Sequence, residues 1–146
     1  MLSIDKLEKY DSQGMYKVYD RWPEIAQECY NLEHKPIKLL GLNHIVFCGM
    51  GGSGAIGDMF SSILSKTNIH VSIVKGYLIP NTINKNSLVV VTSISGNTIE
   101  TLTILESAQN LNCKVIVFSA GGKMKSLCKK NTEFKKSEEC CKIIDH

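Results

Sequence analysis

Short, continuously apolar segments alternate with amphipathic ones along most of this sequence. Four segments are rich in β-branched residues and too short for helices, so they predict buried strands at His44–Cys48, His70–Val74, residues 87–91 and Lys114–Phe118. Continuously apolar strands are typical of parallel sheets, because helices cover both faces of such a sheet.

The segments between these strands carry apolar residues at the three- and four-residue spacing of amphipathic helices. One helix is predicted over residues 56–65 and another over residues 98–111. The apolar stripe of the first consists of Ile56, Met59, Phe60, Ile63 and Leu64. The alternation predicts a doubly wound α/β domain with three αβα layers, in which ligands bind at the carboxyl ends of the strands.

The rest of the chain adds less to this pattern. Two helices are predicted over residues 3–14 and 21–33, so a helical segment of about residues 1–40 precedes an α/β core of about residues 41–146 in one domain, 1–146. Ile143 and Ile144 are candidates for the start of a fifth strand.

Composition excludes several classes of protein. The chain of 146 residues is 43% hydrophobic with a net charge of +3, which suits an anionic small ligand but is too weak to indicate nucleic acid. It has no apolar run near the roughly 20 residues that span a bilayer and no signal-peptide pattern, so we expect a cytoplasmic protein without a membrane segment. The six cysteines form no C-x-x-C pair and indicate no metal site.

Five glycines crowd the stretch V-F-C-G-M-G-G-S-G-A-I-G, residues 46–57, directly after the first predicted strand. Glycines at a strand-to-helix turn let backbone N–H groups approach a ligand closely, and the helix amino terminus favours an anion such as phosphate. Ser53 adds a hydroxyl. The alternative is a tight turn without a ligand.

Two other nucleotide-binding patterns fit this stretch poorly. A P-loop needs Lys after its last glycine, whereas Asp58 follows Gly57 here and would repel phosphate. A dinucleotide fingerprint can be traced from Gly49 to Gly54, but the second strand ends in Val74-Lys75-Gly76 without the acid that holds a ribose. A dinucleotide- or flavin-binding module is therefore a weaker alternative.

A second candidate loop follows the third predicted strand. It places the hydroxyls of Ser93, Ser95 and Thr98 around Gly96 and opens the next helix, which Ser95 or Asn97 can cap. Hydroxyls together with free helix N–H groups form a cradle for phosphate oxygens. Because both loops follow parallel strands, they point to the same edge of the sheet.

The two loops, G-M-G-G-S-G-A-I-G-D and S-I-S-G-N-T-I-E-T-L, resemble the sugar isomerase (SIS) domain. Together with M-Y-K-V-Y-D-R-W-P-E-I-A-Q-E-C, they look like the N-terminal half of the archaeal-type bifunctional phosphoglucose/phosphomannose isomerases. The resemblance covers roughly residues 15–124.

This resemblance implies a flavodoxin-like fold with five parallel strands and a hexose 6-phosphate ligand. Its phosphate would bind to Ser93, Ser95, Gly96, Asn97 and Thr98, while its sugar would lie against Gly51, Gly52 and Ser53. The family interconverts glucose or mannose 6-phosphate with fructose 6-phosphate through an enediolate, without a metal or other cofactor. A homodimer, or a partner chain that carries a second SIS domain, is implied as well.

The catalytic residues stay unknown. In the resembling family the catalytic Glu, a ring-opening His and a late Lys lie in a second SIS domain, and an Arg usually follows the fourth strand. Here A-G-G-K-M-K-S-L-C-K-K-N-T holds no Arg, and Lys123 substitutes only partly. Glu100 and the histidines fit structural roles better. Whether this chain is itself an enzyme is left open, and a non-catalytic sugar-phosphate sensor is the alternative.

Overall fold

The computed structural model describes residues 3–31, 39–111 and 113–130. The chain divides into two compact units, Met1–Ile37 and Lys38–His146. The first unit is helical, whereas the second contains the parallel sheet and its flanking helices.

The helical unit consists of α1 (Ile4–Tyr10), α2 (Met15–Asp20) and α3 (Trp22–Asn31). Residues 3–14 were expected to form one helix, but α1 ends at Tyr10 and the separate helix α2 was not predicted. The break follows from Gly14, which adopts a left-handed φ of 65°, and from Asp11, whose carboxylate accepts the Tyr16 N–H at 2.8 Å. Backbone hydrogen bonds, led by that from Tyr16, lower the pKa of Asp11.

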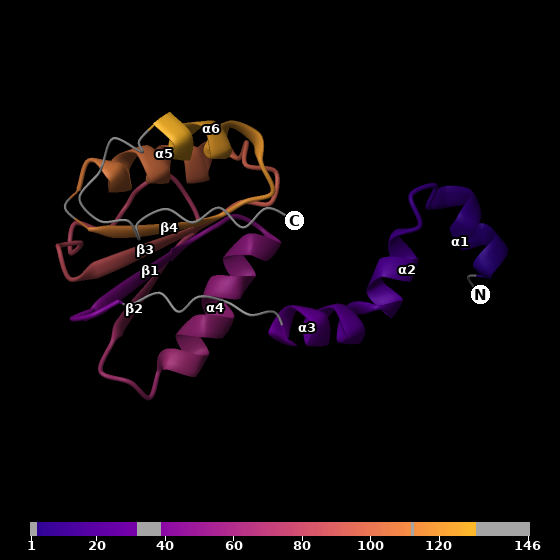
Figure 1. Cartoon of the computed structure of the whole chain (residues 1–146), viewed down its shortest axis with the longest axis horizontal. Coiled ribbons are helices and arrows are strands. Elements are labelled where there is room, and N and C mark those ends of the chain that lie inside the picture. The colour runs from indigo at the N-terminus through magenta and orange to yellow at the C-terminus, as the bar shows by residue number, and fades with distance from the viewer. Residues whose placement is uncertain (1–2, 32–38, 112, 131–146) are drawn as a thin grey trace. The chain divides into compact units, whose positions relative to one another are not determined.

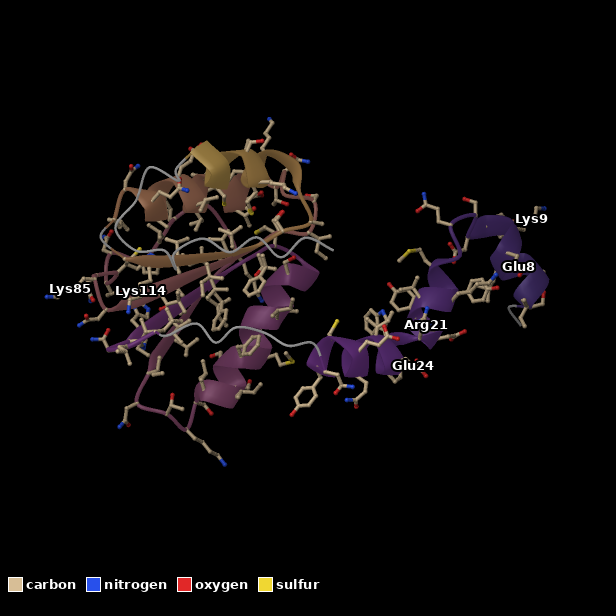
Figure 2. All side chains as sticks on the ribbon, in the orientation of Figure 1. Glu8, Lys9, Arg21, Glu24, Lys85 and Lys114 are labelled. Atoms are coloured by element: carbon tan, nitrogen blue, oxygen red, sulfur yellow. The ribbon has the colours of Figure 1, made fainter. Side chains whose placement is uncertain are left out.

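The described residues of α2 and α3 include no buried side chain. Charged side chains of this unit, such as Arg21 and Glu24, are exposed (Figure 2). Arg21 pairs with Glu28 at 3.4 Å. Such exposed ion pairs contribute little to stability.

All four predicted strands form in the second unit, namely β1 (His44–Cys48), β2 (His70–Val74), β3 (Ser87–Thr92) and β4 (Lys114–Phe118). Their order in the sheet is β2-β1-β3-β4, and every neighbouring pair is parallel. This order confirms the parallel α/β sheet, with four strands among the described residues. The candidate fifth strand at Ile143 and Ile144 lies outside them.

Helix α4 (Gly52–Leu64) covers one face of the sheet, and α5 (Ile99–Gln109) and α6 (Gly122–Lys130) cover the other (Figure 1). The expected three-layer arrangement is therefore present, although α6 was not predicted. The main buried cluster lies between the sheet and α5 and α6, where alternate strand residues such as Val46, Val89 and Val117 meet Ile104 and Leu105.

The apolar stripe predicted for α4 does not face the core as a whole. The exposed fractions of Ile56, Met59 and Ile63 are 42%, 55% and 62%. The helix approaches the sheet through Gly57, where an added Cβ would lie 2.9 Å from the Cβ of Phe47. Phe60 stacks on Phe47 at 5.3 Å between ring centroids, so this part of the stripe contacts the sheet.

Candidate functional site

The two predicted loops lie at one edge of the sheet. The order β2-β1-β3-β4 reverses between β1 and β3, which are hydrogen-bonded neighbours. The β1 loop (residues 49–51) and the β3 loop (residues 93–98) follow the carboxyl ends of these two strands. This is the crevice where open α/β sheets bind their ligands.

The β1 loop leads into α4, and its glycines differ in what they meet. An added Cβ at Gly49 would lie 2.8 Å from the backbone of Ser53, and one at Gly54 would lie 2.7 Å from the Gly49 oxygen, so the turn itself needs both glycines. Gly51 needs its positive φ of 55°. Gly52 has neither constraint, because nothing lies within 4 Å of its Cβ position.

Lys75 directly follows β2, and sequence reasoning missed its contacts with α4. Its ammonium lies 2.6 Å from the Asp58 carboxylate, and its side chain packs against Gly54. The ion pair offsets the negative charge of Asp58 that was expected to repel phosphate. Two exposed partners give this pair little stabilising effect, so its consequence is local neutralisation.

The β3 loop arranges its hydroxyls in sequence. Ser93 is buried and donates to the Thr98 hydroxyl at 3.1 Å, which leaves the Thr98 hydrogen available to another acceptor. Ser95 is exposed, and its Oγ accepts the Asn97 N–H at 3.3 Å. The three hydroxyls therefore lie on one short loop, where Ser93 is buried, Thr98 is half-buried and Ser95 is exposed.

The amino end of α5 has no side-chain cap. The N-cap residue is Thr98, with extended backbone and no side-chain capping bond, so the prediction that Ser95 or Asn97 caps α5 is wrong. The first helical bond here runs from the Leu102 N–H to the Thr98 oxygen at 3.0 Å. The amides of Ile99, Glu100 and Thr101 precede it and carry the partial positive charge of the helix terminus.

A third loop, the β4 loop (residues 119–121), joins the β3 loop and was also missed. Its Ala120 N–H donates to the Ile94 oxygen at 3.1 Å, and Met124 of α6 donates to the Gly96 oxygen at 2.9 Å. The available sequence signal was the glycine pair Gly121-Gly122 directly after a predicted strand.

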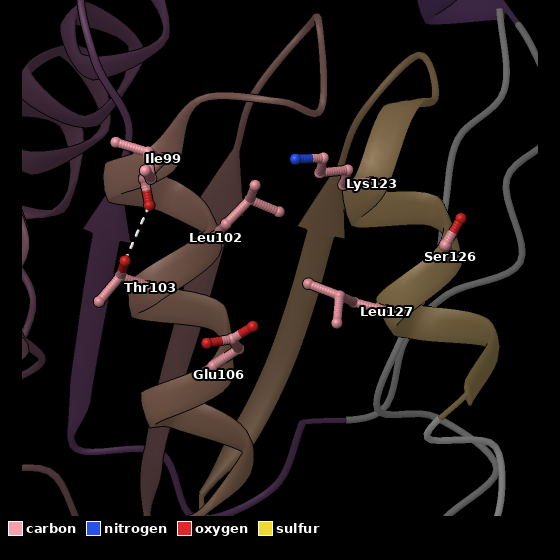
Figure 3. Close-up of a pocket in the computed structure, with 7 residues that line it drawn as sticks. All are labelled: Ile99, Leu102, Thr103, Glu106, Lys123, Ser126 and Leu127. Atoms are coloured by element: carbon pink, nitrogen blue, oxygen red, sulfur yellow. Dashed lines mark hydrogen bonds between the residues drawn. The ribbon is translucent and has the colours of Figure 1, made fainter.

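A groove of about 370 Å³ separates the outer sides of α5 and α6 (Figure 3). Ile99, Leu102 and Leu127 supply apolar walls, and Lys123 points across the groove toward α5. Lys123 was the candidate substitute for the missing Arg. It lies in the first turn of α6, where its backbone N–H contacts the β3 loop through Asn97.

The histidines of the described part lie at the opposite edge, where β1 and β2 begin. The Nε2 atom of His44 lies 2.8 Å from the Ser72 hydroxyl, which also lies 3.3 Å from Nε2 of His70. Burial, and secondarily the neighbouring His70, lower the pKa of His44. His34 and His146 fall outside the described residues, and Glu100 is half-buried in the first turn of α5.

Metal binding, thiol chemistry and membrane insertion find no support in the described part of the chain. Within those residues, no three His, Cys, Asp or Glu side chains gather as a metal site. Burial raises the pKa of Cys48 to about 12, so this thiol is inert at neutral pH. The helices of the described ranges are all too short or too polar to cross a membrane.

Comparison with known protein families identifies a SIS domain over residues 38–138. The chain is 33% identical to the bifunctional phosphoglucose/phosphomannose isomerase of Aquifex aeolicus. This match covers 91% of this chain and 36% of that relative. It is 32% identical to the D-glucosamine-6-phosphate 4-epimerase of Sulfolobus acidocaldarius, over 77% of this chain and 35% of the relative. The chain thus spans about a third of the length of these relatives.

Among solved structures, tagatose-6-phosphate ketose/aldose isomerase from Escherichia coli matches with a TM-score of 0.53 and 18% identity. The match covers 91% of this chain and 35% of that protein. A phosphosugar isomerase structure from Salmonella typhimurium matches with a TM-score of 0.52 and 19% identity, over 68% of this chain and 36% of that one. At these identities the likeness shows the fold alone.

Proposed function

Because the chain belongs to the SIS domain family, we propose that it binds a hexose 6-phosphate at the edge formed by the β1 and β3 loops. The observation that carries the proposal is the position of these loops, which follow neighbouring strands at the point where the strand order reverses. One loop offers hydroxyls and helix amides, while the other offers exposed glycine backbone.

The phosphate group is proposed to bind at the β3 loop. The hydroxyls of Ser95 and Thr98 and the amides at the start of α5 donate to its oxygens, and Ser93 orients Thr98 from the buried side. Gly96 and Asn97 complete this loop. The absence of a side-chain cap on α5 leaves donors for an anion.

The sugar is proposed to lie against the β1 loop and the start of α4. Gly51 and Gly52 are exposed there, and Ser53 is half-buried with a hydroxyl that can bond to sugar oxygens. The open space at the Cβ position of Gly52 is what a ligand close to the backbone requires.

Catalysis is proposed to need groups beyond these loops. In the described residues the carboxylates nearest the loops in sequence are Asp58, which is paired with Lys75, and Glu100. We therefore propose that this chain binds the substrate of a phosphoglucose/phosphomannose isomerase-like reaction, and that a second SIS domain completes the enediolate chemistry. The alternative is a non-catalytic sugar-phosphate sensor or regulatory domain, and either role fits a cytoplasmic location.

An exposed apolar surface on α4 supports the proposal that a second SIS domain takes part. Ile56, Met59 and Ile63 form an exposed apolar stripe on α4. Such a stripe is typical of a helix that a protein partner covers. The proposed partner is a second copy of this chain or another chain that carries a SIS domain.

Calorimetric titration tests the binding proposal. We expect the chain to bind fructose 6-phosphate, to bind inorganic phosphate more weakly, and not to bind fructose. Failure to bind fructose 6-phosphate would contradict the assignment. A coupled isomerase assay on the same sample should show no turnover, and turnover would place the missing base within this chain.

A further inference from the structure

We infer that Asn97 is a positioning residue, which fastens the β3 loop to α6 instead of contacting the ligand. The expected effect of Asn97 on ligand binding rests on the proposed function, whereas its structural role in the loop does not. The side-chain oxygen of Asn97 accepts the Lys123 N–H at 3.0 Å, and its side-chain nitrogen donates to the Ser95 oxygen at 3.1 Å. Both ends of the amide are engaged by protein groups.

The bond to Lys123 caps α6 from another segment of the chain. The neighbouring amide of α6, that of Met124, donates to the Gly96 oxygen at 2.9 Å. Two donors at the amino end of α6 are thus bonded to the β3 loop. The amides at the start of α5 have no such side-chain acceptor, which favours α5 over α6 as the anion-binding terminus.

The close approach of the loops requires glycine at two positions. Gly96 and Gly122 have φ values of 64° and 67°. A Cβ at Gly96 would overlap the Gly121 oxygen, and one at Gly122 would overlap the Ser95 oxygen and lie 2.9 Å from the Asn97 side-chain oxygen. The β4 loop therefore fixes the backbone of Ser95 and Asn97 before any ligand binds.

This arrangement assigns a role to Gly122, on a segment outside the predicted site. A fixed loop holds its hydroxyls and amides in binding geometry, so less conformational entropy is lost when phosphate binds. Disturbing Gly122 should weaken phosphate binding through Ser95 and Asn97, although Gly122 lies on the neighbouring helix.

The test compares Asn97→Ala and Gly122→Ala with Gly41→Ala in the whole chain. Gly41 is a matched control, since its φ of 72° imposes the same backbone strain while nothing lies within 4 Å of its Cβ position. Amide hydrogen exchange is measured without ligand, and affinity for fructose 6-phosphate is measured by calorimetry. Asn97→Asp keeps an oxygen for the Lys123 N–H and serves as the conservative variant.

We expect Asn97→Ala to accelerate exchange at Lys123 and Met124, and Gly122→Ala to accelerate it at Gly96 and Asn97. Both should weaken affinity about tenfold, because small displacements of binding groups are costly. Gly41→Ala should change neither property, and Asn97→Asp should restore slow exchange at Lys123.

Weaker affinity in Asn97→Ala with unchanged exchange would overturn the inference, because it would make Asn97 a direct ligand. Wild-type affinity in a folded Gly122→Ala protein would overturn it as well. If the wild-type chain binds no sugar phosphate, the proposed function fails, and the exchange rates still decide whether Asn97 fastens the two loops.

Discussion

The β1 and β3 loops lie side by side at one sheet edge but are built differently. The β3 loop is held by hydrogen bonds to the β4 loop and α6, and its Gly96 has no room for a side chain. The β1 loop leads into α4 through Gly51 and Gly52, which have open space at their Cβ positions. A fixed set of donors suits an invariant phosphate group, whereas open backbone suits the close approach of a sugar.

The largest expected effect comes from adding a side chain at Gly96 in the β3 loop. Gly96→Ala places a Cβ on the Gly121 oxygen at a left-handed φ, so overpacking and backbone strain should lower the free energy of unfolding by about 2–5 kcal/mol. Urea unfolding measures the loss. A change below about 1 kcal/mol would show that the loops are not packed as described.

A glycine substitution beside the β1 loop should change ligand binding instead of stability. At Gly52→Val the new Cβ has no atom within 4 Å and the position is exposed, so the free energy of unfolding should change by less than about 1 kcal/mol. The new side chain should occupy the space proposed for the sugar and abolish binding of fructose 6-phosphate in calorimetry. Retained binding would show that the β1 loop is a turn that does not contact the sugar.

A smaller effect should come from removing one donor from the β3 loop. Ser95→Ala should weaken affinity for fructose 6-phosphate about ten- to 150-fold, because a hydrogen bond to a charged group is worth about 1.5–3 kcal/mol. Ser62→Ala is a suitable control, since the exposed Ser62 hydroxyl donates within α4 to the backbone oxygen of Asp58. Equal affinities of the two variants would contradict the assignment of phosphate to the β3 loop.

The smallest effect concerns the opposite edge of the sheet, where His44 lies. Because its pKa is lower in the folded chain, the unfolded chain binds more protons as the pH falls below about 6.5. The contribution of neutral His44 to stability is therefore complete above that pH. It is lost as the pH falls toward the pKa of His44 in the folded chain. Urea unfolding at pH 8 and pH 5.5 should show a smaller pH-dependent loss in His44→Gln than in the wild type.

The sequence predicted the parts of this fold that depend on local pattern. Runs such as residues 115–118 are continuously apolar and mostly β-branched. Because the carboxyl ends of parallel strands lie at the same edge of a sheet, both loops were correctly expected at one edge. The start of α4 was placed too late, because Gly52 and Gly54 have poor helix propensity and are helical only through their tertiary setting.

Contacts between distant segments were beyond such reasoning. Helix α6 is rich in lysine and contains few apolar residues, so it was not predicted as a helix. Asn97 and Lys123 lie 26 positions apart, and no periodicity links them. The Asn97 side chain was therefore considered as a cap for α5, whereas in the structure its oxygen accepts the Lys123 N–H at the start of α6. Its contact with a phosphate stays a prediction.

An NMR titration of the amide signals with fructose 6-phosphate tests the central claim most directly. If the two loops form one site, the signals of Gly51, Gly52 and Ser53 should shift together with those of Ser95 and Thr98, with a single dissociation constant. The signals around His44 and His70, at the far edge, should stay in place. Shifts confined to the groove between α5 and α6, or to the far edge, would contradict the account.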